Sequence, residues 1–334
     1  MRSIGIGLIQ MIIERIQAGS TSARRSETPD ARLQSMLVGF ARLSAAAREQ
    51  GISLSPDVAR NSLATMTSMY VATPTGELTV QDTVLSETNP IPLRIYDPAP
   101  GRASRVCLYL HGGGHMAGSI QVYDPICRQV ALTAQCVTVA VDYRLAPEHP
   151  YPQGLDDAQQ VTMHLLARLR ELGYEVQDDL TVAGDSAGGA LTATLSALSM
   201  TQPELHIKRQ ILIYPSLDYT LSQPSVKENA LGYVLESDKI AWYFDNYLPS
   251  DVDRHDASPL FMGAGGLPPT LVFSAGFCPL RDESYAYVAQ LQQAEVEVEH
   301  WNFPEQIHAF LNLQQFVPDA CEAVYQNMAK FINS

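Results

Sequence analysis

The stretch Leu180-Thr-Val-Ala-Gly-Asp-Ser-Ala-Gly-Gly-Ala-Leu191 decides the fold. Its first four residues resemble a buried strand, and an Ala/Leu/Thr segment typical of a helix follows it. The Gly-Asp-Ser-Ala-Gly run between them matches the G-x-S-x-G pattern of a serine at a sharp strand-to-helix turn. Such a turn lifts the Ser186 hydroxyl above the sheet and leaves the Ala187 N–H at a helix N-terminus. The stretch predicts Ser186 as a nucleophile, and the alternative is a Gly/Ser turn without chemistry.

Strand and helix patterns alternate around that turn. The predicted strands are residues 77–85, 91–96, 106–110, 137–141, 180–183, 210–214, 270–275 and 296–303. The predicted helices are residues 31–48, 57–69, 125–134, 155–172, 189–200, 237–247, 281–294 and 320–332. This alternation is typical of βαβ units, and so of an α/β fold with a mostly parallel sheet. Ligands of such sheets bind at the carboxyl ends of the strands.

The alternation also divides the chain into four parts. Residues 1–70 are helical without an apparent core of their own, so we expect them to cover another unit. Residues 71–215 and 261–334 carry the strand and helix pattern of the core. Residues 216–260 interrupt it with an aromatic helix, and we expect this insertion to join the N-terminal helices as a cap or lid.

Composition excludes several classes of function. The chain has 334 residues and a formal net charge of -14, which disfavours binding to the phosphate backbone of nucleic acids. Its five cysteines form no C-x-x-C pair, so we expect neither a structural zinc site nor a disulfide framework. Reduced thiols fit a cytoplasmic protein. The oligomeric state is open, and a homodimer is compatible with the sequence.

The first 16 residues need separate consideration because they are apolar. The run faintly resembles a signal peptide, but Glu14 and Arg15 follow it at once and no clear cleavage site is present. It is too short to span a bilayer, so we expect no stable membrane insertion. An amphipathic helix fits the spacing of its isoleucines better.

Acyl transfer by a serine requires an oxyanion site and a base, and the sequence offers both. The run His111-Gly-Gly-Gly-His115 follows the strand at 106–110, and glycines let a loop bring its N–H groups close to an oxyanion. We expect Gly113 and Gly114, together with Ala187, to be the donors. His111 is expected to hold the loop.

His308 is the candidate base because it follows the last strand, as the Ser…acid…His chain order requires. His300 lies inside a strand pattern beside Trp301, where packing is the expected role. His255 lies in a stretch rich in Asp and Arg, where we expect it at the surface.

Four motifs together resemble a known family. They are HGGGH at 111–115, DYRLAPE at 142–148, GDSAGG at 184–189 and HAF at 308–310. In this order they are similar to the hormone-sensitive-lipase-like (GDXG) carboxylesterases, nearest to the bacterial acetyl-esterase-like members. The resemblance covers residues 75–334. It implies an α/β-hydrolase fold with a helical cap, no cofactor, and hydrolysis of short-chain carboxylic esters as small-molecule substrates.

One position departs from the family pattern. The acid motif of the family reads Asp-Pro-Leu-x-Asp, whereas this chain has Cys278-Pro-Leu-Arg-Asp282. A neutral thiol is a weak acceptor and cannot stabilise an imidazolium as a carboxylate does. Three interpretations follow: Asp282, one helical turn later, replaces the acid; the triad is weakened; or position 278 is a variant. Asp282 is the expected acid.

Two functions are compatible with this departure. The first is a serine carboxylesterase with Ser186, His308 and Asp282 in the catalytic site. The alternative is a nearly inactive or non-catalytic hydrolase-fold protein that binds a small ligand or a regulatory protein partner.

Overall fold

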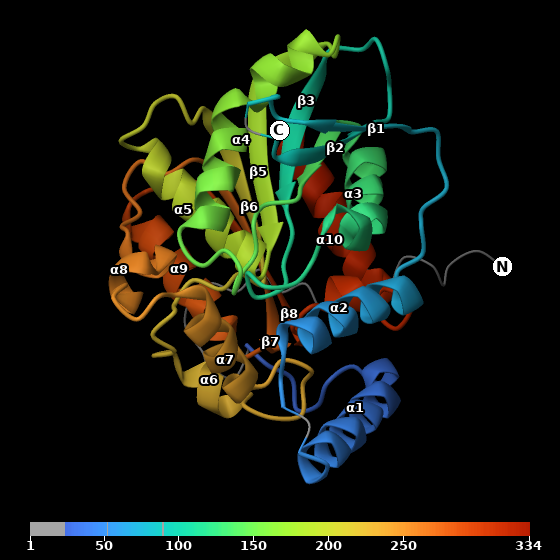
Figure 1. Cartoon of the computed structure of the whole chain (residues 1–334), viewed down its shortest axis with the longest axis vertical. Helices are drawn as coiled ribbons and strands as arrows, with labels where there is room; N and C mark the ends of the chain where they lie inside the picture. Colours follow the sequence, from blue (N-terminus) through green and yellow to red (C-terminus); the bar gives the residue numbers. More distant parts are fainter. Residues whose placement is uncertain (1–23, 52, 89) are drawn as a thin grey trace, which may run out of the picture.

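The fold is built on one eight-stranded sheet, seen in a computed structural model that describes residues 24–51, 53–88 and 90–334 (Figure 1). The strand order is β1-β2-β4-β3-β5-β6-β7-β8. β2 pairs antiparallel with β1 and β4, and the other neighbours pair in parallel. The strands are β1 (Thr79–Val84), β2 (Pro92–Asp97), β3 (Ser104–Leu110), β4 (Val137–Val141), β5 (Val176–Asp185), β6 (Ile207–Ile213), β7 (Thr270–Phe277) and β8 (Val298–Ile307).

Each of the eight strands expected from the sequence is present, and each predicted helix has a counterpart. The helices are α1 (Ala31–Glu49), α2 (Pro56–Tyr70), α3 (Ile120–Ala134), α4 (Gln153–Glu171), α5 (Ala187–Ser199), α6 (Pro224–Glu228), α7 (Ser237–Tyr247), α8 (Arg254–Ala257), α9 (Arg281–Gln293) and α10 (Pro318–Ile332), with 3₁₀ turns η2 (Pro259–Phe261) and η3 (Phe310–Leu313). The predicted start of α3 at residue 125 is wrong. Ser119 caps the helix by accepting a hydrogen bond from the Val122 N–H, and Pro125 lies inside it.

Two layers of helices enclose the sheet. Along β3, alternate side chains point to opposite faces, as the pleat requires. Val106, Leu108 and Leu110 belong to the apolar cluster that includes residues of α4 and α5. Cys107 and Tyr109 belong to the cluster that includes residues of α3 and α10. This alternation buries both faces of the central strand, as a parallel sheet needs.

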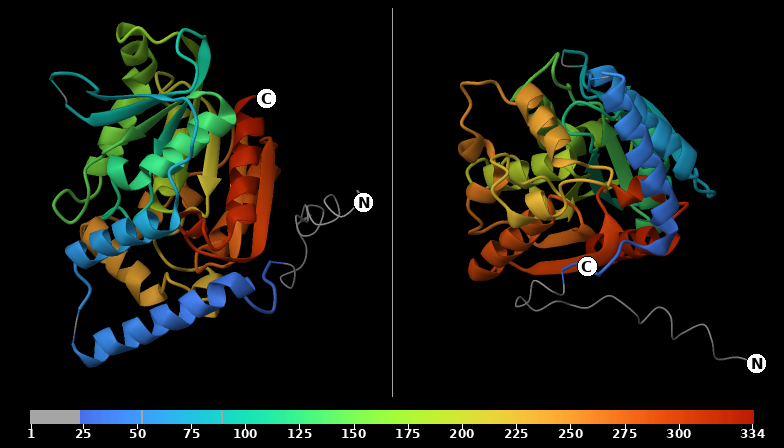
Figure 2. Two further views of the ribbon diagram at one scale, coloured as in Figure 1. Left: turned by 90° about the vertical axis from the view of Figure 1, so that its right-hand side faces the viewer. Right: turned by 90° about the horizontal axis from the view of Figure 1, so that it is seen from below.

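A third group of helices lies at the end of the sheet where the parallel strands finish. α1, α2, α6 and α7 gather there, although the first two precede the sheet in sequence and the others follow β6 (Figure 1; Figure 2). That these helices form a cap with boundaries at 1–70 and 216–260 stays a prediction. The amphipathic helix expected within residues 1–16 lies outside the described residues.

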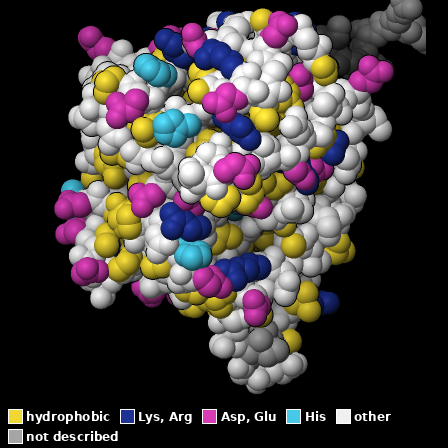
Figure 3. Space-filling model, turned by 45° about the horizontal axis from the view of Figure 1, so that its top comes forward, with side chains coloured by type: hydrophobic (Ala, Val, Ile, Leu, Met, Phe, Trp, Pro, Cys, Tyr) yellow, Lys and Arg dark blue, Asp and Glu magenta, His cyan; other side chains and the backbone are white. Residues whose placement is uncertain are grey.

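Acidic side chains do not gather in one region of the face that Figure 3 shows. Asp and Glu side chains are spread over this face, with Lys and Arg among them. Across the described ranges, none of the helices is both long and apolar enough to cross a membrane.

Candidate active site

Ser186 occupies the predicted turn between β5 and α5. Its backbone has φ 54° and ψ −117°, a region that non-glycine residues rarely adopt and that marks strained functional positions. Gly188 permits this turn, because a Cβ at that position would lie 1.9 Å from the Leu110 carbonyl oxygen. The turn therefore exists only because the chain has a glycine where helix α5 meets β3. It presents the Ser186 hydroxyl to the pocket described below.

The glycine loop after β3 lies beside that serine. Gly113 has φ 124°, a conformation that favours glycine, and both Gly113 and Gly114 line the same pocket as Ser186 and Ala187. Within the described part of the chain, the N–H groups of Gly113, Gly114 and Ala187 make no turn or loop hydrogen bond to another backbone group. The three residues line the pocket, and their role as oxyanion donors stays a prediction. His111 holds the loop through Nδ1, which lies 2.8 Å from the Gly112 carbonyl oxygen.

Asp185 anchors this loop, a role that its place in the elbow motif does not reveal. Its Oδ1 accepts a hydrogen bond from the Gly112 N–H at 2.8 Å. The hydroxyls of Tyr123 and Tyr109 donate to the same carboxylate at 2.9 and 3.2 Å. Burial raises the pKa of Asp185 to about 6, while these three hydrogen bonds oppose the rise. The signal was an acid directly after the buried run 180–184 of β5, where an unpaired carboxylate is rare.

His308 follows β8 and meets the serine. Its Nε2 lies 2.9 Å from the Ser186 Oγ, which is hydrogen-bonding distance for a base and its nucleophile. His300, by contrast, lies inside β8 with its Nε2 2.8 Å from the Ser274 hydroxyl, consistent with packing. His255 is exposed and stacks on Phe261. The structure thus brings only His308 of these three to Ser186.

Cys278 occupies the position on the other side of the imidazole. Its Sγ lies 3.1 Å from the His308 Nδ1, and the Leu280 N–H donates to the same sulfur at 3.3 Å. Both side chains are buried. The order Ser186, His308 and Cys278 therefore has the geometry of a triad in which a thiol replaces the carboxylate.

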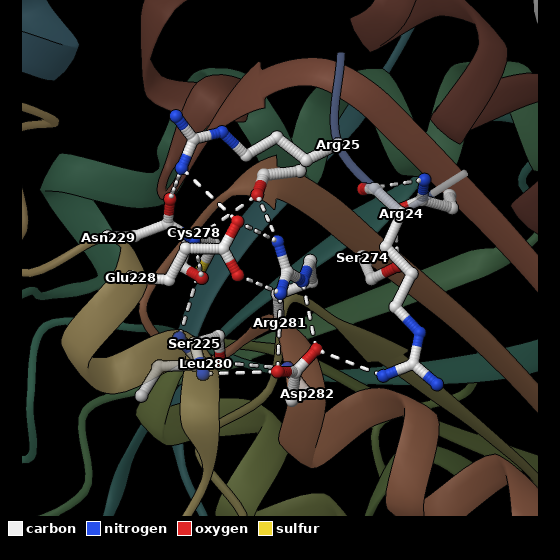
Figure 4. A network of polar contacts seen from close by, with 12 residues as sticks. Arg24, Arg25, Ser225, Glu228, Asn229, Ser274, Cys278, Leu280, Arg281 and Asp282 are labelled. Carbon is white, nitrogen blue, oxygen red and sulfur yellow. Dashed lines mark hydrogen bonds and ion pairs between the residues drawn. The ribbon is translucent and has the colours of Figure 1, made fainter. Parts of the chain in front are cut away.

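The structure does not bring Asp282 to His308, so the predicted placement of this acid is corrected. Its Oδ2 accepts from the Ser225 N–H at 3.0 Å, and its Oδ1 pairs with Arg281 at 2.9 Å and Arg24 at 3.2 Å (Figure 4). The reason is the start of α9 at Arg281: Cys278 precedes the helix and faces the imidazole, whereas Asp282 lies in its first turn and faces α6.

The imidazole of His308 and the thiol of Cys278 are both neutral near pH 7. Burial lowers the pKa of His308 to about 3, and the positive charge of Lys239 lowers it further. Burial also raises the pKa of the Cys278 thiol above its ordinary value. The sulfur accordingly supplies no negative charge to an imidazolium that forms during a reaction.

A pocket opens onto Ser186 and His308 from the helices at the end of the sheet. The cavity has a volume of about 100 Å³. Its walls are largely apolar and come from the core, from α1 and α2, and from α7. Of the aromatic run 242–244, Tyr243 and Phe244 line it. Among the described residues of its lining, Lys239 is the one cation, and burial lowers its pKa.

Comparison with known proteins identifies the family. A family model of the α/β-hydrolase fold matches residues 107–312. Carboxylesterase NlhH of Mycobacterium tuberculosis is 38% identical over 246 residues, which are 72% of this chain and 77% of that protein. The chain belongs to the hormone-sensitive-lipase-like carboxylesterases.

Two further relatives agree with this membership. An ethyl acetate hydrolase of Pseudomonas putida is 36% identical over 241 residues, covering 70% of this chain and 76% of that protein. The structure of EstE1, a thermostable carboxylesterase cloned from a metagenomic library, superimposes with a TM-score of 0.77 at 33% identity. It covers 84% of this chain and 97% of that one. This chain is therefore a carboxylic ester hydrolase of the α/β-hydrolase fold.

Proposed function

We propose that this chain is a serine carboxylesterase that hydrolyses short-chain acyl esters through an acyl-enzyme on Ser186. The observation that carries the proposal is the 2.9 Å separation of the Ser186 Oγ and the His308 Nε2. Cys278, and not Asp282, is the third member of the proposed triad, because its sulfur is the group in contact with Nδ1.

The proposed reaction follows from this geometry. Ser186 attacks the acyl carbonyl carbon while His308 takes the hydroxyl proton at Nε2. The N–H groups of Gly113, Gly114 and Ala187 stabilise the oxyanion, and the α5 dipole adds to their effect at Ala187. The carbon–oxygen bond to the alcohol then breaks and the alcohol receives the proton. Water, deprotonated by the same histidine, releases the acid from the serine.

The thiol makes this triad weaker than one with a carboxylate. A base with a pKa of about 3 is a poor proton acceptor at neutral pH, and a neutral sulfur does not stabilise the imidazolium. In a serine protease, replacing the orienting aspartate by asparagine costs about 10⁴ in turnover. Because Cys278 still contacts Nδ1, we expect turnover to be low but measurable.

The size of the pocket supports short acyl chains. Side chains from the N-terminal helices and from α7 close over Ser186, among them Phe40, Met66 and Tyr243. In this proposal the segments 1–70 and 216–260 act as a cap that limits the acyl group.

The decisive experiment compares wild type with Ser186→Ala. We expect wild type to hydrolyse p-nitrophenyl acetate and butyrate, and the variant to give only the background rate. A fluorophosphonate should label Ser186 of wild type, with the modified peptide identified by mass spectrometry. Equal hydrolysis by the two proteins, or no labelling of Ser186, would overturn the proposal.

A further inference from the structure

The N-terminal segment 24–30 lies along the outer edge of β8, immediately before His308. Backbone hydrogen bonds join the Ser26 N–H to the Pro304 carbonyl at 3.1 Å and the Asp30 N–H to the Glu305 carbonyl at 2.9 Å. The Asn302 side chain donates to the Arg24 carbonyl at 3.2 Å. Because β8 is the last strand of the sheet, the segment occupies hydrogen-bonding groups that no other strand takes.

The same segment also reaches the loop that carries Cys278. The guanidinium of Arg25 donates to the Asn229 Oδ1 at 2.9 Å (Figure 4). It also lies 4.3 Å from the centroid of the Phe277 ring. Asn229 is fully buried, and its Nδ2 donates to the Cys278 carbonyl at 3.0 Å and to the Gly276 carbonyl at 3.2 Å. Arg25 is therefore one hydrogen-bonded residue away from the backbone of Cys278.

A second arginine closes the network around this loop. Arg281 is 3% exposed and pairs with Glu228 at 2.7 Å, and it also donates to the Gly276 carbonyl at 3.2 Å. Glu228 in turn pairs with Arg25 at 3.3 Å. Figure 4 shows Arg25 and Arg281 approaching Glu228 together. A substitution of Arg25 leaves the contacts of Arg281 with Glu228 and the Gly276 carbonyl in place. We therefore expect it to loosen the Cys278 loop without releasing it.

The contacts of segment 24–30 with β8 and with Asn229, here called the clamp, matter because the group facing His308 is a thiol. A carboxylate would draw the imidazolium to itself by charge, whereas a neutral sulfur is a weak acceptor and holds the ring poorly. The distance between Sγ and Nδ1 must then be maintained by the elements that carry the two residues. The segment 24–30 contacts β8 directly on the His308 side, and it reaches the loop after β7 through Asn229 on the Cys278 side.

We propose that Arg25 is a positioning residue of the esterase: through Asn229 it holds the Cys278 backbone so that the sulfur meets Nδ1 of His308. The inference rests on the proposed function of the Ser186 site. It assigns a role in turnover to a segment that touches none of the reacting atoms.

The experiment compares Arg25→Ala and Arg25→Lys with Arg105→Ala. The last variant is a matched control: the Arg105 side chain is 25% exposed, against 24% for Arg25, and it pairs with Asp179 from the start of β3, the opposite end of that strand from the glycine loop. With p-nitrophenyl butyrate, we expect Arg25→Ala to lower kcat about tenfold with KM within about twofold, as small misplacements of catalytic groups do. Arg25→Lys should recover part of the loss, and Arg105→Ala should match wild type.

A double-mutant cycle separates positioning from general destabilisation. In a Cys278→Ala background no sulfur remains to be placed, so Arg25→Ala should change kcat by less than about twofold. Melting temperatures of all variants are measured in parallel. An equal loss of kcat in both backgrounds, or a loss that only follows the melting temperature, overturns the proposal.

A readout without catalysis distinguishes this proposal from the proposed function. Alkylation of the native protein by iodoacetamide, followed by peptide mass spectrometry, measures how often the Cys278 loop opens. We expect Arg25→Ala to speed labelling of Cys278 about tenfold while Cys321, buried beside Phe310, keeps its rate. Unchanged labelling overturns the role of Arg25. Inactivity of wild type relative to Ser186→Ala, with faster labelling of Cys278 in Arg25→Ala, refutes the esterase chemistry but not the clamp.

Discussion

Replacing Cys278 by aspartate restores the missing charge behind His308 and should make the enzyme faster. The Sγ is already 3.1 Å from Nδ1, so a carboxylate oxygen at this position can accept the Nδ1–H directly. The Leu280 N–H, which now donates to the sulfur at 3.3 Å, is available to the new carboxylate as well. Cys278→Asp therefore changes the charge of the contact without requiring the loop to move.

The expected gain follows from electrostatics. Two unit charges about 4 Å apart attract by about 4 kcal/mol at an effective dielectric constant of about 20. Burial of the carboxylate costs part of this, and the Leu280 N–H offsets some of the cost. A net stabilisation of about 3 kcal/mol in the transition state corresponds to about a hundredfold increase in kcat. The gain should stay below the factor of about 10⁴ known for loss of the aspartate in a serine protease.

The pH profile provides a second measure of the same effect. The acid limb of kcat/KM reports the free enzyme's base, so wild type should remain active down to roughly pH 4, because burial lowers the pKa of His308 to about 3. A carboxylate favours the protonated ring, so Cys278→Asp should shift this limb to higher pH.

Cys278→Asn is the matched control, because it has the shape of aspartate without the charge. Initial rates on p-nitrophenyl butyrate and melting temperatures are measured for all three proteins. A folded Cys278→Asp enzyme with no gain over wild type, or an equal gain in Cys278→Asn, would refute the reasoning.

Three other substitutions test the site. Asp282→Asn should keep kcat within about threefold, since the carboxylate does not contact His308, but it should lower the free energy of unfolding in urea by about 2 kcal/mol through its lost buried ion pair. Loss of most activity would return Asp282 to the triad. Lys239→Gln removes a positive charge that lowers the pKa of His308, so the acid limb of kcat/KM should move to higher pH; an unmoved limb contradicts this coupling. Tyr123→Phe removes a hydrogen-bond donor to the Asp185 carboxylate, so the pKa of Asp185 should rise above about 6. Because Asp185 anchors the glycine loop, kcat should fall about tenfold with little change in KM. Unaltered kcat between pH 5 and pH 9 would show that the oxyanion loop does not depend on this contact.

Local patterns account for what the sequence predicted correctly. The eight strands and the elbow at Ser186 depend on residues within a few positions of one another, and such patterns are visible in a single chain. The bounds predicted for α7, 237–247, match the structure because Pro249 and the preceding aromatic run mark this helix. His308 was chosen because it follows the last strand, as the Ser…acid…His chain order requires.

The sequence did not reveal side-chain directions or contacts between residues far apart in the chain. Asp282 is one helical turn beyond Cys278, but the point at which α9 begins turns its side chain toward Arg281 and away from the imidazole. Asp185 was named within the elbow motif, yet its role needs the Gly112 N–H, which comes from the loop after β3.

The contacts of segment 24–30 have a consequence for solubility. An uncovered edge strand offers its carbonyl and N–H groups to any other extended chain. Ser26 and Asp30 occupy two carbonyls near the end of β8, at Pro304 and Glu305, and so shield part of this edge. Removal of the segment would present a bare strand at the rim of the molecule, and chains so shortened should associate edge to edge as their concentration rises.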